Sequence, residues 1–174
     1  MRALTSITFV YDTKEDRVVA AINPGRAEAW SCWLTRRLVL ALLERAAEFV
    51  ASKSALAQRA PADMRGEFAA FEREAAIATT AKAMSKTPDD VLRSSADAAE
   101  LAARVTIQNR GDKFRLELHG ESGEGAEAAL TQAEIVRILQ MLQGVVAKAG
   151  WLASPAQPQS APNRDVTGPK PFRN

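Results

Sequence analysis

Residues 105–118, VTIQNRGDKFRLEL, contain the pattern that decides the fold. Apolar side chains occupy every second position on both sides of a polar segment at residues 109–112. These apolar residues are Val105, Ile107, Phe114, Leu116 and Leu118. Alternation with a period of two is typical of a strand with one buried face, and a polar segment with glycine between two such runs predicts a β-hairpin.

The residues after this hairpin predict a loop and then a helix. Residues 120–127 are rich in Gly and Glu, but they lack the Lys-Ser/Thr ending of a phosphate-binding loop. We therefore interpret them as a solvated connector. Thr131 and Glu134 have the spacing of a helix capping box. The apolar positions of the following helix recur at intervals of three and four residues, at Ile135, Ile138, Leu139, Leu142, Val145 and Val146.

The beginning of the chain shows the same order of elements. Apolar and β-branched residues predict strands at residues 4–11 and 17–22, joined by a polar turn. Pro24 and Gly25 end the second strand, because proline has no amide donor and glycine readily adopts positive φ. From about residue 26 to residue 53 the apolar positions change to helical spacing, which predicts a long helix.

The two halves align with each other, which indicates an internal repeat. A shift of 96 residues places Leu34-Thr35 on Leu130-Thr131 and superposes most apolar positions of the two helices, with Leu38 on Glu134 as the exception. The first strands need a shift of 98, so the loops differ in length. Two interpretations remain open: a repeated ββα unit, or a chance match between two amphipathic helices.

These elements predict an α+β fold in which two β-hairpins form an antiparallel sheet covered by helices. We expect a single domain at residues 1–152, with ββα units at 3–53 and 104–151 and a helical insertion at 54–103. One insertion helix is expected to begin with Thr87 as cap and Pro88 in its first turn, and to carry Val91, Leu92, Ala99 and Leu101. Residues 153–174 are rich in proline, which predicts a disordered tail.

Composition narrows the class of protein. The 174 residues include 23 basic and 21 acidic side chains, and 47% are hydrophobic, as in ordinary globular proteins. No apolar run reaches the roughly 18 residues that span a bilayer, so we expect no direct membrane insertion. The first residues lack the pattern of a signal peptide, so we expect a cytoplasmic protein.

The sequence contains no set of residues that predicts catalysis. His119 is the only histidine and Cys32 the only cysteine, and they lie far apart in the chain. Acid–base catalysis most often uses a positioned histidine, and a metal site needs several ligands. We interpret His119 as an exposed residue at a strand end and Cys32 as a core residue. We therefore expect no enzymatic activity, no metal and no cofactor.

The first predicted helix has apolar residues outside its buried stripe, which favours a binding function. Trp33 and Leu40 form a second line beside Arg37, and Trp30 lies toward its other side. Tryptophan is a frequent anchor in protein interfaces. The sequence therefore predicts a protein–protein interaction module, such as an adaptor, assembly factor or accessory subunit, that forms a homodimer or binds another protein. The alternative is that the middle helices cover this line.

The tail supplies a further candidate contact. Lys170, Phe172 and Arg173 resemble a linear motif with an aromatic anchor and steering charges, although an inert solubilising tail has the same composition. The alternative function is binding of single-stranded nucleic acid by basic residues on or near the hairpins: Lys14, Arg17, Arg110, Lys113 and Arg115. Against it, Phe9, Tyr11 and Phe114 belong to the apolar strand faces rather than to exposed stacking positions.

Overall fold

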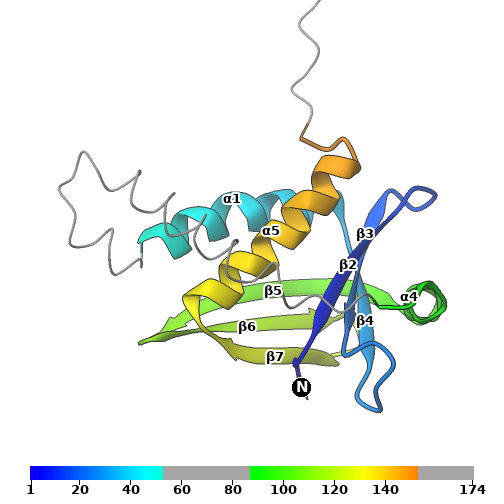
Figure 1. Cartoon of the computed structure of the whole chain (residues 1–174), viewed down its shortest axis with the longest axis horizontal. Coiled ribbons are helices and arrows are strands. Elements are labelled where there is room, and N and C mark those ends of the chain that lie inside the picture. The colour runs from blue at the N-terminus through cyan, green and yellow to red at the C-terminus, as the bar shows by residue number, and fades with distance from the viewer. Residues whose placement is uncertain (53–86, 153–174) are drawn as a thin grey trace, which may run out of the picture.

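The computed structural model describes residues 1–52 and 87–152, which contain three helices and a seven-stranded sheet (Figure 1). The strands are β1 (Arg2–Ala3), β2 (Ile7–Asp12), β3 (Arg17–Ile22), β4 (Trp30–Leu34), β5 (Glu100–Arg110), β6 (Lys113–Gly120) and β7 (Gly125–Leu130). The helices are α1 (Arg36–Ser52), α4 (Asp89–Asp97) and α5 (Gln132–Lys148). The sheet has the order β1-β7-β6-β5-β4-β3-β2 and is mostly antiparallel, which confirms the predicted α+β class.

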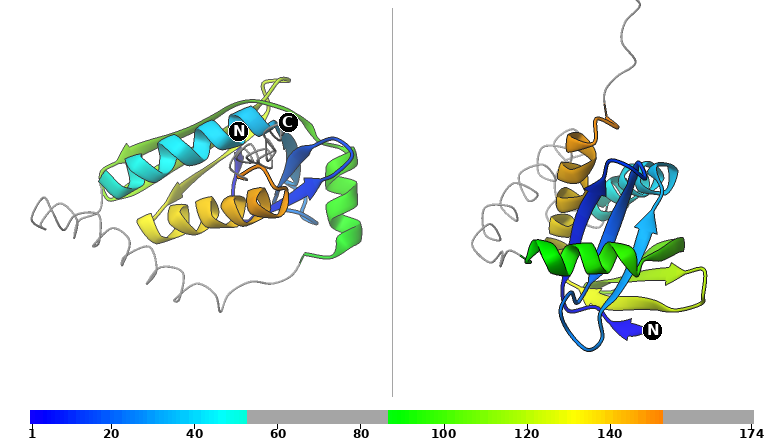
Figure 2. Two further views of the ribbon diagram at one scale, coloured as in Figure 1. Left: turned by 90° about the horizontal axis from the view of Figure 1, so that it is seen from above. Right: turned by 90° about the vertical axis from the view of Figure 1, so that its right-hand side faces the viewer.

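The helices lie on different sides of this sheet. Helices α1 and α5 pack against each other over the two three-stranded meanders, whereas α4 packs against β3 and β4 (Figure 2). The core lies between α1, α5 and the meanders. Its fully buried large side chains include Ile22, Leu34, Val39, Ile135 and Leu142.

Each repeat contains three strands and a helix rather than two strands and a helix. Residues 30–34 form strand β4, although the sequence predicted that the helix included them. Residues 125–130 form strand β7, although the sequence predicted a loop through residue 127. The repeat is therefore β2-β3-β4-α1 followed by β5-β6-β7-α5.

The pairing register explains the two alignment shifts. Asp12 pairs with Arg17 across a four-residue turn, whereas Arg110 pairs with Lys113 across a two-residue turn. The first strands therefore align at a shift of 98, and everything after the turn aligns at 96. This agreement of register with sequence favours a true repeat over a chance match between helices.

Both repeat helices begin after an equivalent threonine. The Thr131 hydroxyl accepts a hydrogen bond from the Glu134 backbone N–H, and the Glu134 carboxylate accepts one in return from the Thr131 N–H, so the predicted capping box is confirmed. The Thr35 hydroxyl accepts from the Leu38 backbone N–H at 3.3 Å, without a return bond from the leucine. Leu38 and Glu134 are the mismatched pair of the alignment, and Glu134 is the residue whose side chain completes the capping box of α5.

The first strand of each repeat crosses to the other repeat. Glu100 and Leu101 at the start of β5 pair in parallel with β4, and Arg2–Ala3 pair in parallel with β7. At the shift of 98, residues 2–12 correspond to residues 100–110, so β1 and β2 together match the single strand β5. The two ends of the sheet are consequently joined by the short link at residues 4–6.

The buried Asn23 holds this link. It is 1% exposed and has a φ of 48°. Its Oδ1 accepts hydrogen bonds from the Thr5 and Ser6 backbone N–H groups and from the Thr5 hydroxyl, and its Nδ2 donates to the Ala3 carbonyl at 2.7 Å. One side chain therefore satisfies several polar groups of the link, while the Leu4 N–H donates to the Glu127 carbonyl of β7.

The insertion differs in detail from the prediction. Helix α4 begins at Asp89 with Pro88 as its N-cap residue and with no side-chain cap, so the start lies one residue later than predicted. It ends at Asp97, so Ala99 follows the helix and Leu101 lies in β5. The second repeat begins at Glu100 rather than at residue 104. The predicted helix within residues 53–86 and the predicted tail from residue 153 lie outside the described residues.

Candidate functional site

A groove of about 390 Å³ lies between α1 and β5. Helix α1 runs along this strand in the second view (Figure 2, left). The lining side chains are apolar except for one arginine and one threonine: Leu38, Ala41, Leu42, Arg45, Ala46, Phe49, Val105, Thr106 and Ile107. The groove therefore offers apolar contact to a ligand, with a single positive charge at its wall.

The groove meets the edge of β5 rather than one of its faces. Val105, Thr106 and Ile107 are consecutive, and successive residues of a strand point to opposite faces. A groove that touches all three must therefore pass along the strand's edge. On that edge β4 pairs only with Glu100 and Leu101, whereas β6 pairs with the other edge as far as Arg110.

The equivalent position in the other repeat is filled. Helix α5 packs directly on β2, and its Ile138 and Leu139 are buried. Their counterparts on α1 at the shift of 96, Leu42 and Leu43, are only half-buried. The strand counterparts at the shift of 98 differ in the same direction, since Phe9 is buried and Ile107 is half-buried. The groove is thus a packing site that one repeat fills and the other leaves open.

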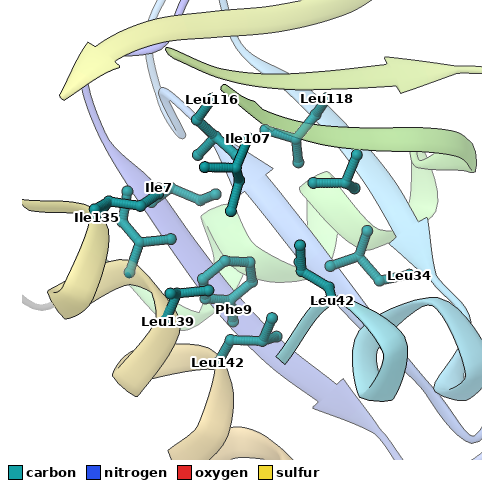
Figure 3. Close-up of a pocket in the computed structure, with 12 residues that line it drawn as sticks. Ile7, Phe9, Leu34, Leu42, Ile107, Leu116, Leu118, Ile135, Leu139 and Leu142 are labelled. Carbon is teal, nitrogen blue, oxygen red and sulfur yellow. The ribbon is translucent and has the colours of Figure 1, made fainter. Parts of the chain in front are cut away.

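Beneath the groove lies a small cavity of about 20 Å³ (Figure 3). Twelve apolar residues line it, including Leu42, Val105 and Ile107, which also line the groove. A cavity of this size that has no polar lining is expected to stay dry. The groove floor is therefore continuous with the hydrophobic core, and α1 can be displaced only at the expense of core contacts.

Positive charge flanks the open edge of β5. Arg104 and Arg110 are exposed at the two ends of the unpaired stretch, and Arg45 lines the groove. Residues 101–111 contain no acidic residue. The open edge therefore combines unpaired backbone, apolar side chains and a local excess of positive charge.

The predicted tryptophan surface is not a helix surface. Trp30 and Trp33 lie on β4, and α1 begins only at Arg36. Three residues apart on a strand, the two tryptophans point to opposite faces of the sheet. Trp30 packs against the core, and its Nε1 donates to the Glu100 carboxylate at 2.8 Å. The structure therefore does not bring the tryptophans together with Leu40.

The remaining predicted interface residues also separate. Arg37 is exposed on the first turn of α1, and Leu40 is half-buried against the core. Lys170, Phe172 and Arg173 lie outside the described residues. The basic residues of the nucleic-acid alternative divide between two hairpins: Lys14 and Arg17 belong to the β2–β3 hairpin, and Arg110, Lys113 and Arg115 to the β5–β6 hairpin. Arg115 forms ion pairs with Glu117 and Glu127.

The single cysteine is buried in the core, and the single histidine is half-buried beside a glutamate. Cys32 is fully buried on β4, and burial together with the nearby Glu100 carboxylate raises the pKa of its thiol to about 12. The thiol is therefore a poor nucleophile at neutral pH, and its prediction as a core residue is confirmed. His119 lies near the end of β6, as predicted, but it is half-buried rather than exposed, with the Glu117 carboxylate at 3.4 Å. Within residues 1–52 and 87–152, no group of three potential metal ligands lies together.

Sequence reasoning missed the groove because it follows from the distance between α1 and β5. One signal was available: at the shift of 96, Ala46 falls on Leu142, so the first helix has a much smaller side chain at this apolar position. A repeat that loses volume at an equivalent core position predicts an open space there. That signal acquires meaning only once the third strands establish that the repeats correspond.

No protein-family model matches the sequence, and no curated protein or solved structure is significantly similar to it. None of the helices in the described residues is both long enough and apolar enough to cross a bilayer. The groove between α1 and β5 is therefore the feature of the described residues that bears most directly on function.

Proposed function

We propose that this protein is a non-enzymatic protein–protein interaction module that binds its partner in the groove between α1 and β5. In this proposal it acts in the cytoplasm as an adaptor, assembly factor or accessory subunit. The observation that carries the proposal is the open packing site: α5 fills the space beside β2, whereas α1 leaves about 390 Å³ beside β5. A partner that covers the half-buried apolar side chains around such a groove removes apolar surface from water, which favours binding.

Other features support protein rather than nucleic acid as the ligand. A strand edge and an apolar groove match the way that protein domains bind peptide segments. The basic residues of the nucleic-acid alternative lie on two hairpins whose turns are at different ends of the sheet (Figure 1). The structure of the described residues thus offers an apolar groove but no continuous basic surface with exposed aromatic side chains.

Site-specific photocrosslinking tests the proposal. A photoreactive amino acid replaces Ala41, which lines the groove, and a matched variant carries it at Ala129, which is exposed on β7. Each variant is irradiated in extract of the protein's own cells. We expect a discrete protein adduct from the Ala41 position that is absent from the Ala129 position.

A blocking substitution makes this test specific to the groove. Ala46→Leu introduces the side chain that the other repeat has at the equivalent position. We expect it to narrow the groove and to weaken or abolish the adduct, with the fold retained as judged by circular dichroism. An adduct that persists in Ala46→Leu, or that forms equally at both positions, would contradict the proposal. An adduct of two copies of this chain would identify the partner as a second copy of the chain, in a homodimer.

A further inference from the structure

We infer that the partner binds as an additional β-strand along the open edge of β5, and that this strand carries acidic residues at its two ends. This inference rests on the proposed function, because it specifies what occupies the same groove. It combines three observations on β5: an edge without a strand partner, an apolar wall beside it, and arginines at its ends.

The backbone of β5 favours an extended ligand. Beyond Leu101 the strand pairs only with β6, so alternate N–H and C=O groups on its other edge lack a ladder partner within the described residues. Backbone polar groups need hydrogen-bond partners, and an exposed edge is a template for another strand. The stretch from Arg104 to Arg110 is seven residues long, so it offers space for a strand of about 23 Å.

The wall formed by α1 determines which side chains the ligand needs. A strand beside β5 places every second side chain toward the helix, at intervals of about 6.6 Å. Leu38, Leu42 and Phe49 of α1 face that position. Small or β-branched apolar residues at alternate positions therefore suit the ligand.

The charges disfavour a second copy of β5 in the symmetric register centred on Ile107. In an antiparallel pair of two β5 strands centred on Ile107, Arg104 of each copy would lie opposite Arg110 of the other. Like charges that face each other across a strand pair are destabilising, whereas opposite charges stabilise it. Since residues 101–111 include no acid, a ligand with carboxylates at its ends is the complementary partner.

Four synthetic seven-residue peptides test the inference by fluorescence anisotropy against the full chain. The first alternates valine and threonine between terminal glutamates, and the second has lysines in place of the glutamates. The third and fourth have the sequence of the first with N-methyl groups on alternate residues, at the odd positions in one and at the even positions in the other. We expect the glutamate peptide to bind about tenfold more tightly than the lysine peptide. We expect N-methylation at one of these two sets of positions to weaken binding about tenfold, and N-methylation at the other set to have little effect.

Charge reversal in the protein supplies the matched control. Arg104→Glu with Arg110→Glu should reverse the preference, so that the lysine peptide binds more tightly than the glutamate peptide. Arg37→Glu with Arg93→Glu changes the net charge equally at exposed helix positions away from the groove lining, and it should preserve the preference for glutamate.

The outcomes separate this inference from the proposed function. Three results would overturn strand addition. N-methylation at the odd and at the even positions could have equal effects, the glutamate and lysine peptides could bind equally, or no peptide could bind at millimolar concentration. A stable dimer in sedimentation that Arg104→Glu with Arg110→Glu disrupts would overturn it too. If the Ala41 adduct is nevertheless lost in Ala46→Leu, the groove remains a protein-binding site that uses another mode of binding.

Discussion

Ala46 on α1 and Leu142 on α5 occupy equivalent positions of the two repeats, 96 residues apart, and both are buried. Leu142 packs into the core beside Phe9 of β2, in the space that separates α5 from the sheet (Figure 3). Ala46 lines the groove beside β5. The difference of three carbon atoms lies where the two repeats differ in packing, so the groove has a direct cause in the sequence.

Ala46→Leu should stabilise the isolated protein while it narrows the groove. The added carbons would be partly buried against Leu42 and Ile107, which is worth about 1 kcal/mol. For a chain of this size that corresponds to a rise of about 2–4 °C in Tm. Differential scanning calorimetry measures the change. Overpacking would instead lower Tm, and that result would show that the groove cannot accept a leucine.

Substitution of Asn23 should separate the link at residues 4–6 from the rest of the sheet. Asn23→Ala removes the acceptor of three hydrogen bonds and the donor of a fourth in a buried position, so we expect a loss of about 2–4 kcal/mol. Urea denaturation measures it. Asn23→Gly also lacks the side chain but tolerates the φ of 48°, so it should cost less than alanine. Equal costs would mean that backbone strain contributes nothing.

The elements that were predicted correctly have clear signals at their ends. Strand β3 was predicted with its observed limits, and the capping box at Thr131 fixed the start of α5. The residues of β3 from Val18 to Ile22 are buried on both faces, and its limits are marked by the polar turn before it and by Pro24 and Gly25 after it, whereas a capping box marks the start of α5. Local pattern is sufficient there, because packing imposes the same choice as the residues themselves.

The two third strands could not be predicted from local pattern, for different reasons. Strand β4 lies between the core and α4, so its residues are apolar or small on both faces, and such a run does not distinguish strand from helix. Strand β7 reads GAEAAL, and alanine and glycine have low strand propensity. It forms because β6 and β1 pair with its two edges. Gly125 permits that approach, since a Cβ there would overlap the Leu118 carbonyl.

Asp16 should make the stability of the fold depend on acid pH. Its carboxylate accepts hydrogen bonds from the Trp151 Nε1 and the Tyr11 hydroxyl, both at 2.8 Å, and these bonds lower its pKa. A carboxyl group whose pKa is lower in the folded state stabilises that state above its ordinary pKa of 3.8, and the effect is lost as pH falls through the folded value. Asp16→Asn should therefore lower Tm at pH 7, and the difference in Tm should diminish as pH falls through the lowered pKa of Asp16.

Asparagine is the suitable replacement because it also tolerates the φ of 48° at this position. Thermal unfolding of both proteins from pH 7 to acid measures the difference in Tm. A difference that stays constant across this range would contradict a role for the charge. Tyr11 supplies an independent check, because its hydrogen bond to Asp16 raises the pKa of the phenol, and Asp16→Asn should lower that pKa toward 10.0 in an absorbance titration.

Cys32 should be inaccessible to thiol reagents in the folded protein. Burial raises the pKa of the thiol to about 12, so almost no thiolate forms at pH 8. We expect an aromatic disulfide reagent to label Cys32 no faster than the protein unfolds, and labelling to become rapid in urea. Fast labelling of the native protein would show that β4 opens locally.

Gly120 and Glu100 should behave as an energetically coupled pair. A Cβ at Gly120 would overlap the Glu100 carboxylate, which accepts hydrogen bonds from Trp30 and from Ser122. Burial raises the pKa of Glu100, but these bonds outweigh it and leave the pKa below its ordinary value. Gly120→Ala must therefore displace a carboxylate that joins β4 and β5 to the β6–β7 turn, at a cost of about 1–3 kcal/mol.

A double-mutant cycle tests that mechanism. In the background of Glu100→Ala the clash has no carboxylate to displace, so Gly120→Ala should cost at least about 1 kcal/mol less than in the natural protein. Chemical denaturation of the four proteins gives the coupling energy. Additive costs would place the penalty in the backbone at residue 120. The φ of Gly120 is not positive, so strain from a left-handed conformation is not an alternative source of that penalty.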